Sequence, residues 1–273
     1  MKGKIILITG ASGGIGRAVA KAFAAQGARL LLVGRQAKPL IELIATLRAE
    51  GAEARLLLAD LLTSDPTEVA RQAIKTYGSL DGIVNCAGVQ HFGLGAAEAA
   101  AATAQTFAIN TVVPIQLIQA LLPHLQSRPR AHIVNVGSIF GSIGFPCFAS
   151  YSASKFALRG YSEALRRELA GGPIHVHYVA PRYTRTPFNG EAVTRMAEAL
   201  GMNQDTPARV AEQVLAAVTR NAGDTYLGWP EKIFVRLNAI LPRLVDLALI
   251  RQGRQMLPFV RPKLVESPQE IQA

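Results

Sequence analysis

Short apolar runs and longer amphipathic stretches alternate along residues 1–85. The predicted strands span four to six residues each and show little polar alternation, which is typical of strands buried on both faces of a sheet. The amphipathic stretches carry apolar residues at helical spacing, and Gly27 and Gly51 follow two of them. The pattern predicts strands at 4–8, 29–33, 53–58 and 82–85, and helices at 14–26, 39–50 and 65–77.

The alternation continues to about residue 228. An alanine-rich stretch, 96–104, is predicted to enter one long helix that ends near residue 125. Thr206 and Pro207 are typical of a helix start, so a helix is predicted at 206–220. The remaining pattern predicts strands at 132–136, 174–179 and 225–228, a helix at 150–170, and a loop with short helices at 187–201.

Strand and helix in strict succession predict an α/β fold: a single Rossmann-like, doubly wound parallel sheet of about seven strands, flanked by helices and followed by a C-terminal helical extension. We find no linker and no internal repeat, so residues 1–273 are predicted to form a single dinucleotide-binding and catalytic domain. Hydrophobic residues make up 49% of the chain and charged residues 18%, a balance that excludes general disorder.

The cellular setting follows from composition. Two cysteines, Cys86 and Cys147, are too few for a disulfide framework and suit a reducing cytosol. The apolar run at 5–8 is too short for the core of a secretory signal, and no uninterrupted apolar stretch reaches the roughly 18 residues of a spanning helix. We therefore expect a cytoplasmic protein that is soluble or associates peripherally with a membrane.

The net charge of +10 suits an anionic ligand or partner, but also a merely solvated surface. No nucleic-acid motif is visible, so nucleic acid is not an expected partner. The five histidines show no metal-ligand spacing, and no metal site is expected. His175 and His177 alternate along a predicted strand and are expected to form a surface pair.

Basic and apolar residues interleave in the C-terminal extension, 229–264. Seven Lys and Arg residues oppose two acidic residues there, and Pro242 is predicted to break or kink the helix. Three alternatives stay open: a helix packed on the body or on a second subunit, a membrane-surface helix, or a lid over an apolar substrate.

The first predicted strand runs directly into a glycine-rich loop. Glycines at 10, 14 and 16 allow a tight turn and a close approach of a pyrophosphate, and the next helix presents free N–H groups to that anion. Because the loop joins a strand to a helix and opens a βαβ unit, we predict a dinucleotide-binding loop. Its candidate cofactor-binding residues are Gly10, Ser12, Gly14, Ile15 and Gly16.

The end of the second predicted strand is expected to meet the adenosine ribose. An acidic residue there favours NAD, but this chain has Gly34 followed by Arg35. A guanidinium binds phosphate in a bidentate manner, so the sequence favours NADP(H) over NAD(H), with Ser12 as a further contact. Asp60, after the third strand, is a candidate acceptor for the adenine amino group.

Tyr151 and Lys155 stand four residues apart in the helix predicted at 150–170, and so share one face. A phenol is a poor base at neutral pH, and a neighbouring ammonium is expected to lower its pKa. The pair is therefore a candidate acid/base unit for moving a proton to or from a substrate oxygen.

Over roughly residues 4 to 228, the chain resembles the short-chain dehydrogenase/reductase family. The resemblance depends on an ordered set of modest motifs rather than on any one of them. In chain order they are Gly10, Gly14 and Gly16 after Thr9, then Asp60, the run Asn85-Cys86-Ala87-Gly88, Asn110, Ser138, Tyr151 with Lys155, and Pro181.

The resemblance implies roles for these residues. Tyr151 is the proton donor in reduction and the base in oxidation, and Lys155 lowers its pKa and binds the nicotinamide ribose. Ser138 binds the substrate oxygen, and Asn110 holds a water that relays protons to Lys155. The remaining implied positions support the cofactor: Asn85, Ala87 and Gly88 along its path, and Pro181, Thr184 and Thr186 near the nicotinamide and diphosphate.

The chain departs from the family pattern at two positions. Cys86 stands where the family often has Asn, and Arg182 follows Pro181 where it often has Gly. The second departure restricts the backbone near the nicotinamide, in the segment that leads to Thr184 and Thr186. Phe140, Phe145 and Phe148 are expected either to wall the substrate site or to pack in the core, and Cys147 is a further candidate lining residue.

The sequence thus predicts an NADP(H)-dependent oxidoreductase that moves a hydride between the nicotinamide and a carbonyl or secondary alcohol of an apolar substrate, such as an acyl, ring-ketone or lipid-like molecule. The family resemblance also implies a homodimer or homotetramer. The alternatives are a non-catalytic, cofactor-sensing Rossmann protein and a peripheral membrane-binding protein that uses the C-terminal extension. Residues 182–205 and that extension are expected to define the substrate.

Overall fold

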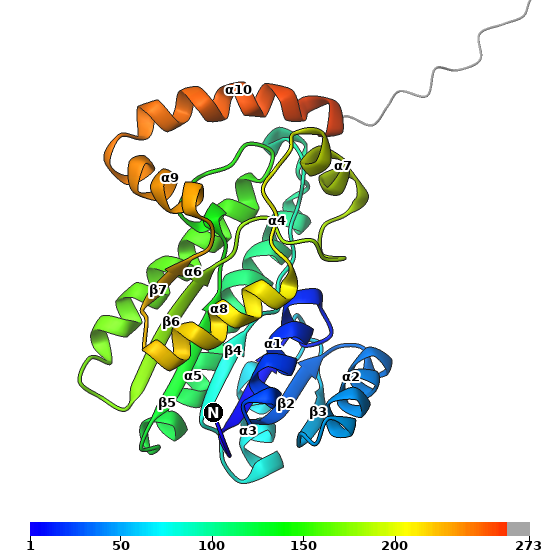
Figure 1. Ribbon diagram of the computed structural model, residues 1–273, viewed down its shortest axis with the longest axis vertical. Helices are drawn as coiled ribbons and strands as arrows, with labels where there is room; N and C mark the ends of the chain where they lie inside the picture. Colours follow the sequence, from blue (N-terminus) through cyan, green and yellow to red (C-terminus); the bar gives the residue numbers. More distant parts are fainter. Residues whose placement is uncertain (261–273) are drawn as a thin grey trace, which may run out of the picture.

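The computed structural model describes residues 1–260 and has a seven-stranded sheet at its centre, in which all strands run parallel (Figure 1). The strand order is β3-β2-β1-β4-β5-β6-β7. The strands are β1 (Ile5–Thr9), β2 (Arg29–Gly34), β3 (Ala54–Leu58), β4 (Gly82–Asn85), β5 (Ala131–Val136), β6 (Ile174–Ala180) and β7 (Asp224–Tyr226).

Helices cover both faces of the sheet. The helices α1 (Gly14–Ala25), α2 (Ala37–Ala49) and α8 (Pro207–Arg220) pack on one face, where they share an apolar core with Ile6 and Ile8. The opposite face carries α3 (Pro66–Tyr77), α5 (Val113–Gln126) and α6 (Ala149–Glu168), around Leu7 and Leu31. Alternate residues of β1 therefore enter two different cores, which explains its unbroken apolar sequence.

The strand order reverses between β1 and β4, because β2 and β3 lie on one side of this pair and β5, β6 and β7 on the other. In an open parallel sheet, a crevice forms beyond the carboxyl ends of the strands at this point. The predicted fold class, a doubly wound parallel sheet of seven strands, is thereby confirmed.

Helix caps agree with the sequence prediction. Asp65 accepts a hydrogen bond from the Thr67 N–H at the start of α3, and Thr206 accepts one from the Arg209 N–H at the start of α8. Each of these bonds satisfies one N–H group that the helix leaves free. The predicted loop at 187–201 contains one helix, α7 (Glu191–Ala199).

The predicted long helix is confirmed as one helical run, Ala100–Gln126, in which the π-helical turn η2 (Ala108–Val112) separates α4 (Ala100–Phe107) from α5. One prediction about local structure is wrong. Strand β3 is not buried on both faces, since Leu56 and Leu58 are exposed. As an edge strand, β3 has a sheet neighbour on one side only.

The expected surface pair of histidines is also corrected. His177 is buried, and its Nε2 lies 3.0 Å from Nδ1 of His132, on the neighbouring strand β5. His177 Nδ1 is 2.7 Å from the carbonyl oxygen of Ala222. The burial of His177 follows from its place on β6, an inner strand with helices on both faces. His175, nearer the start of the strand, stays partly exposed.

The C-terminal extension forms two helices, α9 (Trp229–Ile240) and α10 (Pro242–Val260), which lie beyond the carboxyl ends of the strands (Figure 1). Pro242 begins α10, so the predicted break is confirmed. The last part of the predicted extension, 261–264, lies outside the described residues.

One helical run, Ala100–Gln126, is long and apolar enough to cross a membrane by length and composition alone. Its C-terminal half, α5, contributes Leu117, Ile118 and Leu121 to the core on the sheet. A buried core helix passes the same test, so this run carries no argument for a spanning segment.

Candidate active site

A cleft of about 730 Å³ lies at the carboxyl ends of the strands, between the sheet and helices α7, α9 and α10. Of the seventeen predicted site residues, only Asn85 and Asn110 do not line it. The residues that do are Gly10, Ser12, Gly14, Ile15, Gly16, Arg35, Asp60, Ala87, Gly88, Ser138, Tyr151, Lys155, Pro181, Thr184 and Thr186. The structure thus brings together residues that follow six different strands, β1 to β6, and residues of helix α6.

The glycine-rich loop packs so closely that a side chain at three positions would collide with its surroundings. Gly10 has φ +62°, and a Cβ there would lie 2.7 Å from the Cα of Ala87. A Cβ on Gly14 would lie 2.5 Å from Cγ2 of Thr186, and one on Gly16 would lie 2.2 Å from the Gly10 carbonyl oxygen. The loop therefore needs glycine for a left-handed turn and for backbone approach, as the sequence predicted.

The start of α1 fits an anion. Gly13 is its N-cap and supplies no side-chain hydrogen bond, and the first turn of the helix contains no acidic residue. Residues 13–16 line the cleft. The free N–H groups and the positive end of the helix dipole therefore meet the cleft without a competing carboxylate, which suits the pyrophosphate of a dinucleotide.

Arg35 and Asp60 lie at the ends of neighbouring strands, β2 and β3, and both are exposed. Arg35 forms no ion pair with any residue in 1–260, so its guanidinium is available to a ligand. Asp60 Oδ1 accepts a hydrogen bond of 3.0 Å from the Leu62 N–H, which holds the carboxylate in the turn. Ser12 lies close to Gly34, since a Cβ on that glycine would be 3.5 Å from its Oγ.

Tyr151, near the start of α6, is buried at the deep end of the cleft. Burial raises the pKa of its phenol to about 12, and a hydrogen bond with the Ser138 side chain opposes that rise only in part. Ser138 reaches this position because it caps a short 3-10 turn, Ile139–Gly141, after β5, and its Oγ accepts the Phe140 N–H at 3.1 Å.

Lys155 lies one helical turn beyond Tyr151 and is also buried. Its Nζ donates a hydrogen bond of 3.1 Å to the Val136 carbonyl oxygen and lies 5.9 Å from the centre of the Tyr151 ring. Burial lowers the pKa of Lys155 to about 8. The two side chains share one helix face, as predicted.

The predicted lowering of the Tyr151 pKa by Lys155 is wrong for the protein on its own. Burial is the larger effect at this site, and the ammonium is not among the groups that shift the phenol. At neutral pH the phenol is therefore protonated, which makes Tyr151 a proton donor rather than a resident phenolate.

Asn110 lies behind the cleft, in the π-helical turn η2. Its Oδ1 accepts the Val89 N–H at 2.9 Å, and its Nδ2 donates to the Val89 carbonyl oxygen at 2.8 Å and to Ser154 Oγ at 3.0 Å. These bonds tie the segment after β4 to helix α6. The structure gives Asn110 a positioning role, and the implied water relay to Lys155 stays a prediction.

Asn85 also acts from behind the cleft. Its Nδ2 donates to Asn135 Oδ1 at 2.9 Å, and Asn135 Nδ2 donates to Ser162 Oγ at 2.8 Å. This buried chain of hydrogen bonds joins β4 and β5 to α6, the helix that carries Tyr151. Neither Asn135 nor Ser162 was predicted, because the sequence does not show which polar residues of separate elements will meet.

The segment after β6 is held by Arg182, the residue that departs from the family pattern. Its guanidinium binds Asp205 with contacts of 3.0 and 3.1 Å and Glu231 at 3.3 Å. Arg182 thereby connects this segment to α9, while Thr184 and Thr186 still line the cleft. No sequence pattern indicated these partners, which lie 23 and 49 residues away.

The other half of the cleft is apolar. Phe140, Phe145 and Phe148 line it, and Phe140 and Phe145 stack with ring centres 4.3 Å apart. Cys147 is buried beside them but does not line the cleft, and burial raises the pKa of its thiol. Additional apolar lining comes from α7 and the loop after it and from α9 and α10, as expected for substrate-defining segments: Val193, Met196, Leu200, Met202, Phe234, Val245 and Leu249.

Comparisons with known proteins agree with this geometry. The family model for short chain dehydrogenases matches residues 4–197. The chain is 32% identical over 271 residues to dehydrogenase/reductase SDR family member 7B of Bos taurus, which covers 93% of this chain and 83% of that protein.

Two solved structures are similar in fold. A short-chain dehydrogenase/reductase from Burkholderia phymatum, in complex with NAD, has a TM-score of 0.80 and 25% identity, and the match covers 90% of this chain and 95% of that chain. A protein described as an NAD(P)-dependent gluconate 5-dehydrogenase from Beutenbergia cavernae, with NADP bound, has a TM-score of 0.76 and 26% identity over 83% of this chain and 95% of that one.

The family model, the relative and the solved structures all indicate the same family. The cleft agrees with them, because the glycine-rich loop and the start of α1 line it together with the buried Tyr151 and Lys155. The chain therefore belongs to the short-chain dehydrogenase/reductase family and is an oxidoreductase that uses a nicotinamide cofactor.

Proposed function

We propose that the protein is an NADP(H)-dependent oxidoreductase that reduces the carbonyl group of an apolar substrate and, in reverse, oxidises the corresponding secondary alcohol. The observation that carries this proposal is the position of Tyr151. Its phenol lies in the same cleft as the glycine-rich loop and next to the apolar wall formed by Phe140, Phe145 and Phe148.

The protein's own groups suit proton transfer to a newly formed alkoxide. When bound, NADPH supplies the hydride that the carbonyl carbon accepts. Tyr151 keeps its proton at neutral pH, because burial raises its pKa, and can donate it to the substrate oxygen. The Ser138 hydroxyl supplies a second hydrogen-bond donor at that oxygen, and two donors directed at the developing negative charge stabilise the transition state.

Arg35 supports the preference for NADP(H). It stands at the end of β2, where a carboxylate would favour NAD, and it has no acidic partner among residues 1–260. A guanidinium in this position attracts the 2′-phosphate that distinguishes NADP from NAD.

The proposal of an apolar substrate is supported by the apolar side chains that line the cleft, among them Phe140 and Leu249. Aromatic and aliphatic side chains of α7, α9 and α10 line the same cleft as Tyr151, together with a smaller number of polar side chains. An acyl, ring-ketone or lipid-like substrate would bury its apolar surface against them, which favours binding roughly in proportion to the area removed from water.

A spectroscopic screen tests the proposal. Oxidation of NADPH is followed by its absorbance with a panel of ketones of increasing apolar size, for the unchanged protein and for Tyr151→Phe. We expect turnover to fall about 1,000-fold in the variant while NADPH binding, measured by fluorescence titration, is retained. Tyr161→Phe, a change on the same helix away from the cleft, is the matched control. Equal turnover in Tyr151→Phe and the unchanged protein would remove this phenol from the mechanism.

The homodimer or homotetramer stays a prediction, as do the cytoplasmic location and the single domain. Light scattering of the purified protein would measure its oligomeric state.

A further inference from the structure

Helices α9 and α10 present two different faces. Their buried residues Val235, Val245 and Met256 point inward, where Met256 joins the cluster around Phe148 and Tyr151. The outward face is apolar and exposed. Of the sixteen large hydrophobic side chains that are exposed within residues 1–260, eight lie in this stretch: Trp229, Ile233, Phe234, Ile240, Leu241, Leu244, Leu247 and Ile250.

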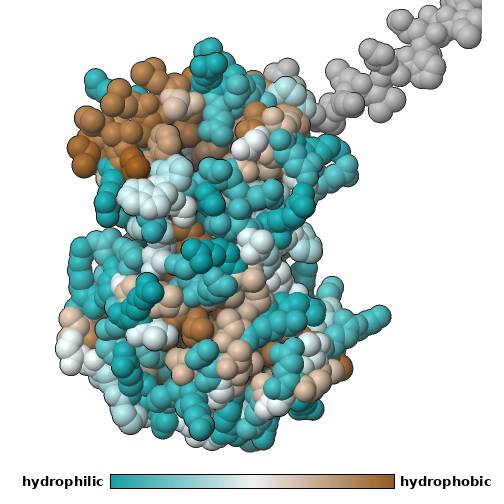
Figure 2. Space-filling model, viewed as in Figure 1, coloured by the Kyte–Doolittle hydropathy of each residue, from teal (hydrophilic) through white to brown (hydrophobic). Residues whose placement is uncertain are grey.

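These side chains gather into one surface, which we call the outer apolar patch. Figure 2 shows it as a brown area at the upper left, over the turn between α9 and α10. Trp229 and Ile240 are each 76% exposed and Leu247 is 69% exposed. Single exposed hydrophobic residues are ordinary, but a contiguous group of this kind marks an interaction surface.

Basic residues surround the outer apolar patch. Lys232, Arg236, Arg243, Arg251 and Arg254 are all exposed, and none forms an ion pair with a residue in 1–260. Arg243 and Arg251 each lie one helical turn from Leu247.

Acidic residues do little to offset this charge. Of the two in α9 and α10, Glu231 is bound to Arg182 and only Asp246 is exposed. A second copy of the chain docked face to face would bring together two positive rims, which repel each other. An anionic lipid surface supplies both the opposite charge and an apolar layer.

We propose that the outer apolar patch docks on the surface of an anionic lipid bilayer, with α9 and the first half of α10 in the interface. The apolar side chains enter the boundary between headgroups and acyl chains, and the five basic side chains contact the phosphate layer. Phe234 belongs both to the patch and to the lining of the cleft, so the docked face adjoins the cleft opening.

Sedimentation with vesicles tests the docking directly. Binding of the full chain is measured on vesicles of equal parts phosphatidylcholine and phosphatidylserine, and on phosphatidylcholine alone. We expect the unchanged protein to sediment with the mixed vesicles and to bind the neutral ones at least about tenfold more weakly, because the basic residues lose their partners. A protein that stays in the supernatant with mixed vesicles would overturn the proposal.

Variants separate the apolar from the charged contribution. Ile240→Asp with Leu247→Asp is expected to weaken binding to mixed vesicles at least about tenfold. Ile41→Asp with Leu58→Asp, at exposed apolar positions on α2 and β3 outside the patch, is the control and should bind like the unchanged protein. Arg243→Gln with Arg251→Gln should weaken binding to mixed vesicles and leave binding to neutral vesicles unchanged.

The same variants test whether a second copy of the chain, rather than a lipid surface, covers the outer apolar patch. Light scattering without vesicles measures the mass of the unchanged protein and of Ile240→Asp with Leu247→Asp. Equal masses support the lipid surface, whereas a dimer that the double variant converts to a monomer would show that another copy covers the patch and would overturn the proposal. Because no activity is measured, the result does not depend on the reaction that the cleft performs.

Discussion

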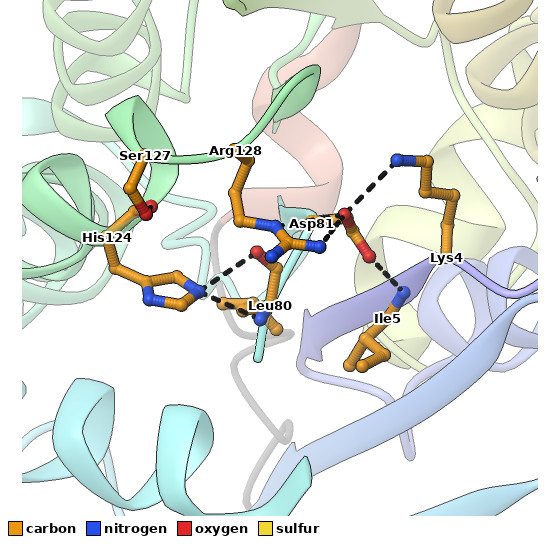
Figure 3. Close-up of polar contacts among 7 residues, drawn as sticks. All are labelled: Lys4, Ile5, Leu80, Asp81, His124, Ser127 and Arg128. Carbon is orange, nitrogen blue, oxygen red and sulfur yellow. Dashed lines mark hydrogen bonds and ion pairs between the residues drawn. The ribbon is translucent and has the colours of Figure 1, made fainter. Parts of the chain in front are cut away.

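The two ends of the sheet each contain a buried charged group, Asp81 and Lys155, and the two groups differ in how many partners they have. At the amino end, Asp81 is buried just before β4, and Lys4, Arg128 and the Ile5 N–H all bind its carboxylate at 2.9 to 3.2 Å (Figure 3). Beside it, His124 Nε2 lies 2.9 Å from the Leu80 nitrogen.

At the carboxyl end, Arg182 is paired with Asp205 and Glu231, but two other basic groups of the cleft have few partners. Lys155 is buried with one hydrogen bond, to the Val136 carbonyl oxygen, and the exposed Arg35 has no acidic partner in 1–260.

The pKa values reflect this difference. Burial alone would raise the pKa of Asp81, but bonds from Ile5, Arg128 and Lys4 more than offset it, so that the pKa is lowered. At Lys155 burial is the leading effect and the pKa falls to about 8, which disfavours the charged form. The charge on Asp81 therefore stabilises the fold, whereas the charge on Lys155 is held at the expense of stability, as is typical of reactive sites.

Replacing Lys155 by methionine should produce the largest effect. We expect Lys155→Met to lower turnover at least about 100-fold without lowering the free energy of unfolding at neutral pH, because the charge that it removes is held at the expense of stability. The folded-state pKa lies below the unfolded one, so the charge destabilises the fold fully below pH 8 and not at all well above pH 10.5. Relative to the unchanged protein, the variant should therefore gain stability as pH falls from 10.5 to 8, measured by urea unfolding.

The opposite outcome is expected at the other end of the sheet. Asp81→Ala leaves Lys4, Arg128 and the Ile5 N–H without their acceptor and should lower the free energy of unfolding by about 2 kcal/mol, a figure that allows for the partly exposed cations. Turnover per folded molecule should not change. Asp246→Ala, an exposed carboxylate on α10, is the control. A loss of turnover without a loss of stability would contradict the division between the two ends.

Arg35 allows a finer comparison within the carboxyl end. Arg35→Asp should shift the ratio of kcat/KM for NADPH over NADH towards NADH by about tenfold or more, because a carboxylate repels the 2′-phosphate and binds a ribose hydroxyl. Lys38→Asp, also exposed but outside the cleft lining, is the control for general charge effects. No shift in the ratio would reject the assignment of Arg35 to the 2′-phosphate.

The smallest effect concerns the buried histidines in the amino half of β5 and β6. Burial, together with the neighbouring positive charges, lowers the pKa of His132 to about 3, and burial is the main cause of the fall of the His177 pKa to about 4. Both folded-state values lie below the unfolded value near 6.5, so stability should fall as pH drops from 6.5 towards 4. His177→Asn should make this decline shallower by about 1 kcal/mol per pH unit, whereas His91→Asn should not.

Local patterns predicted much of the fold. Short stretches rich in apolar residues located all seven strands, and Asp65 and Thr206 marked helix starts that the structure confirms. These features are set by neighbouring residues, through the period of a strand or helix and the need to cap free N–H groups. The same reasoning did not reveal the π-helical turn η2 within the long helix, where Asn110 binds Ser154 of α6.

The candidate site was predictable in part for the same reason. Four-residue spacing put Tyr151 and Lys155 on one helix face, and the glycine spacing marked a loop that leaves no room for side chains. The direction of the Tyr151 pKa was not predictable, because it depends on how deeply the phenol is buried. Likewise, the histidine pair and the partners of Arg182 join positions 23 to 49 residues apart.

By itself, the sequence determined the succession of strands and helices along the chain, the glycine-rich loop and the tyrosine–lysine pair. Each of these features depends on residues that are close together in the sequence. Only the tertiary structure decided which buried charges find partners, as Asp81 does and Lys155 largely does not. It also decided that α9 and α10 line the cleft with one face and leave the other exposed. The physical reason is that desolvation and pairing depend on the distances between segments, and these are set only when the sheet and its helices pack together.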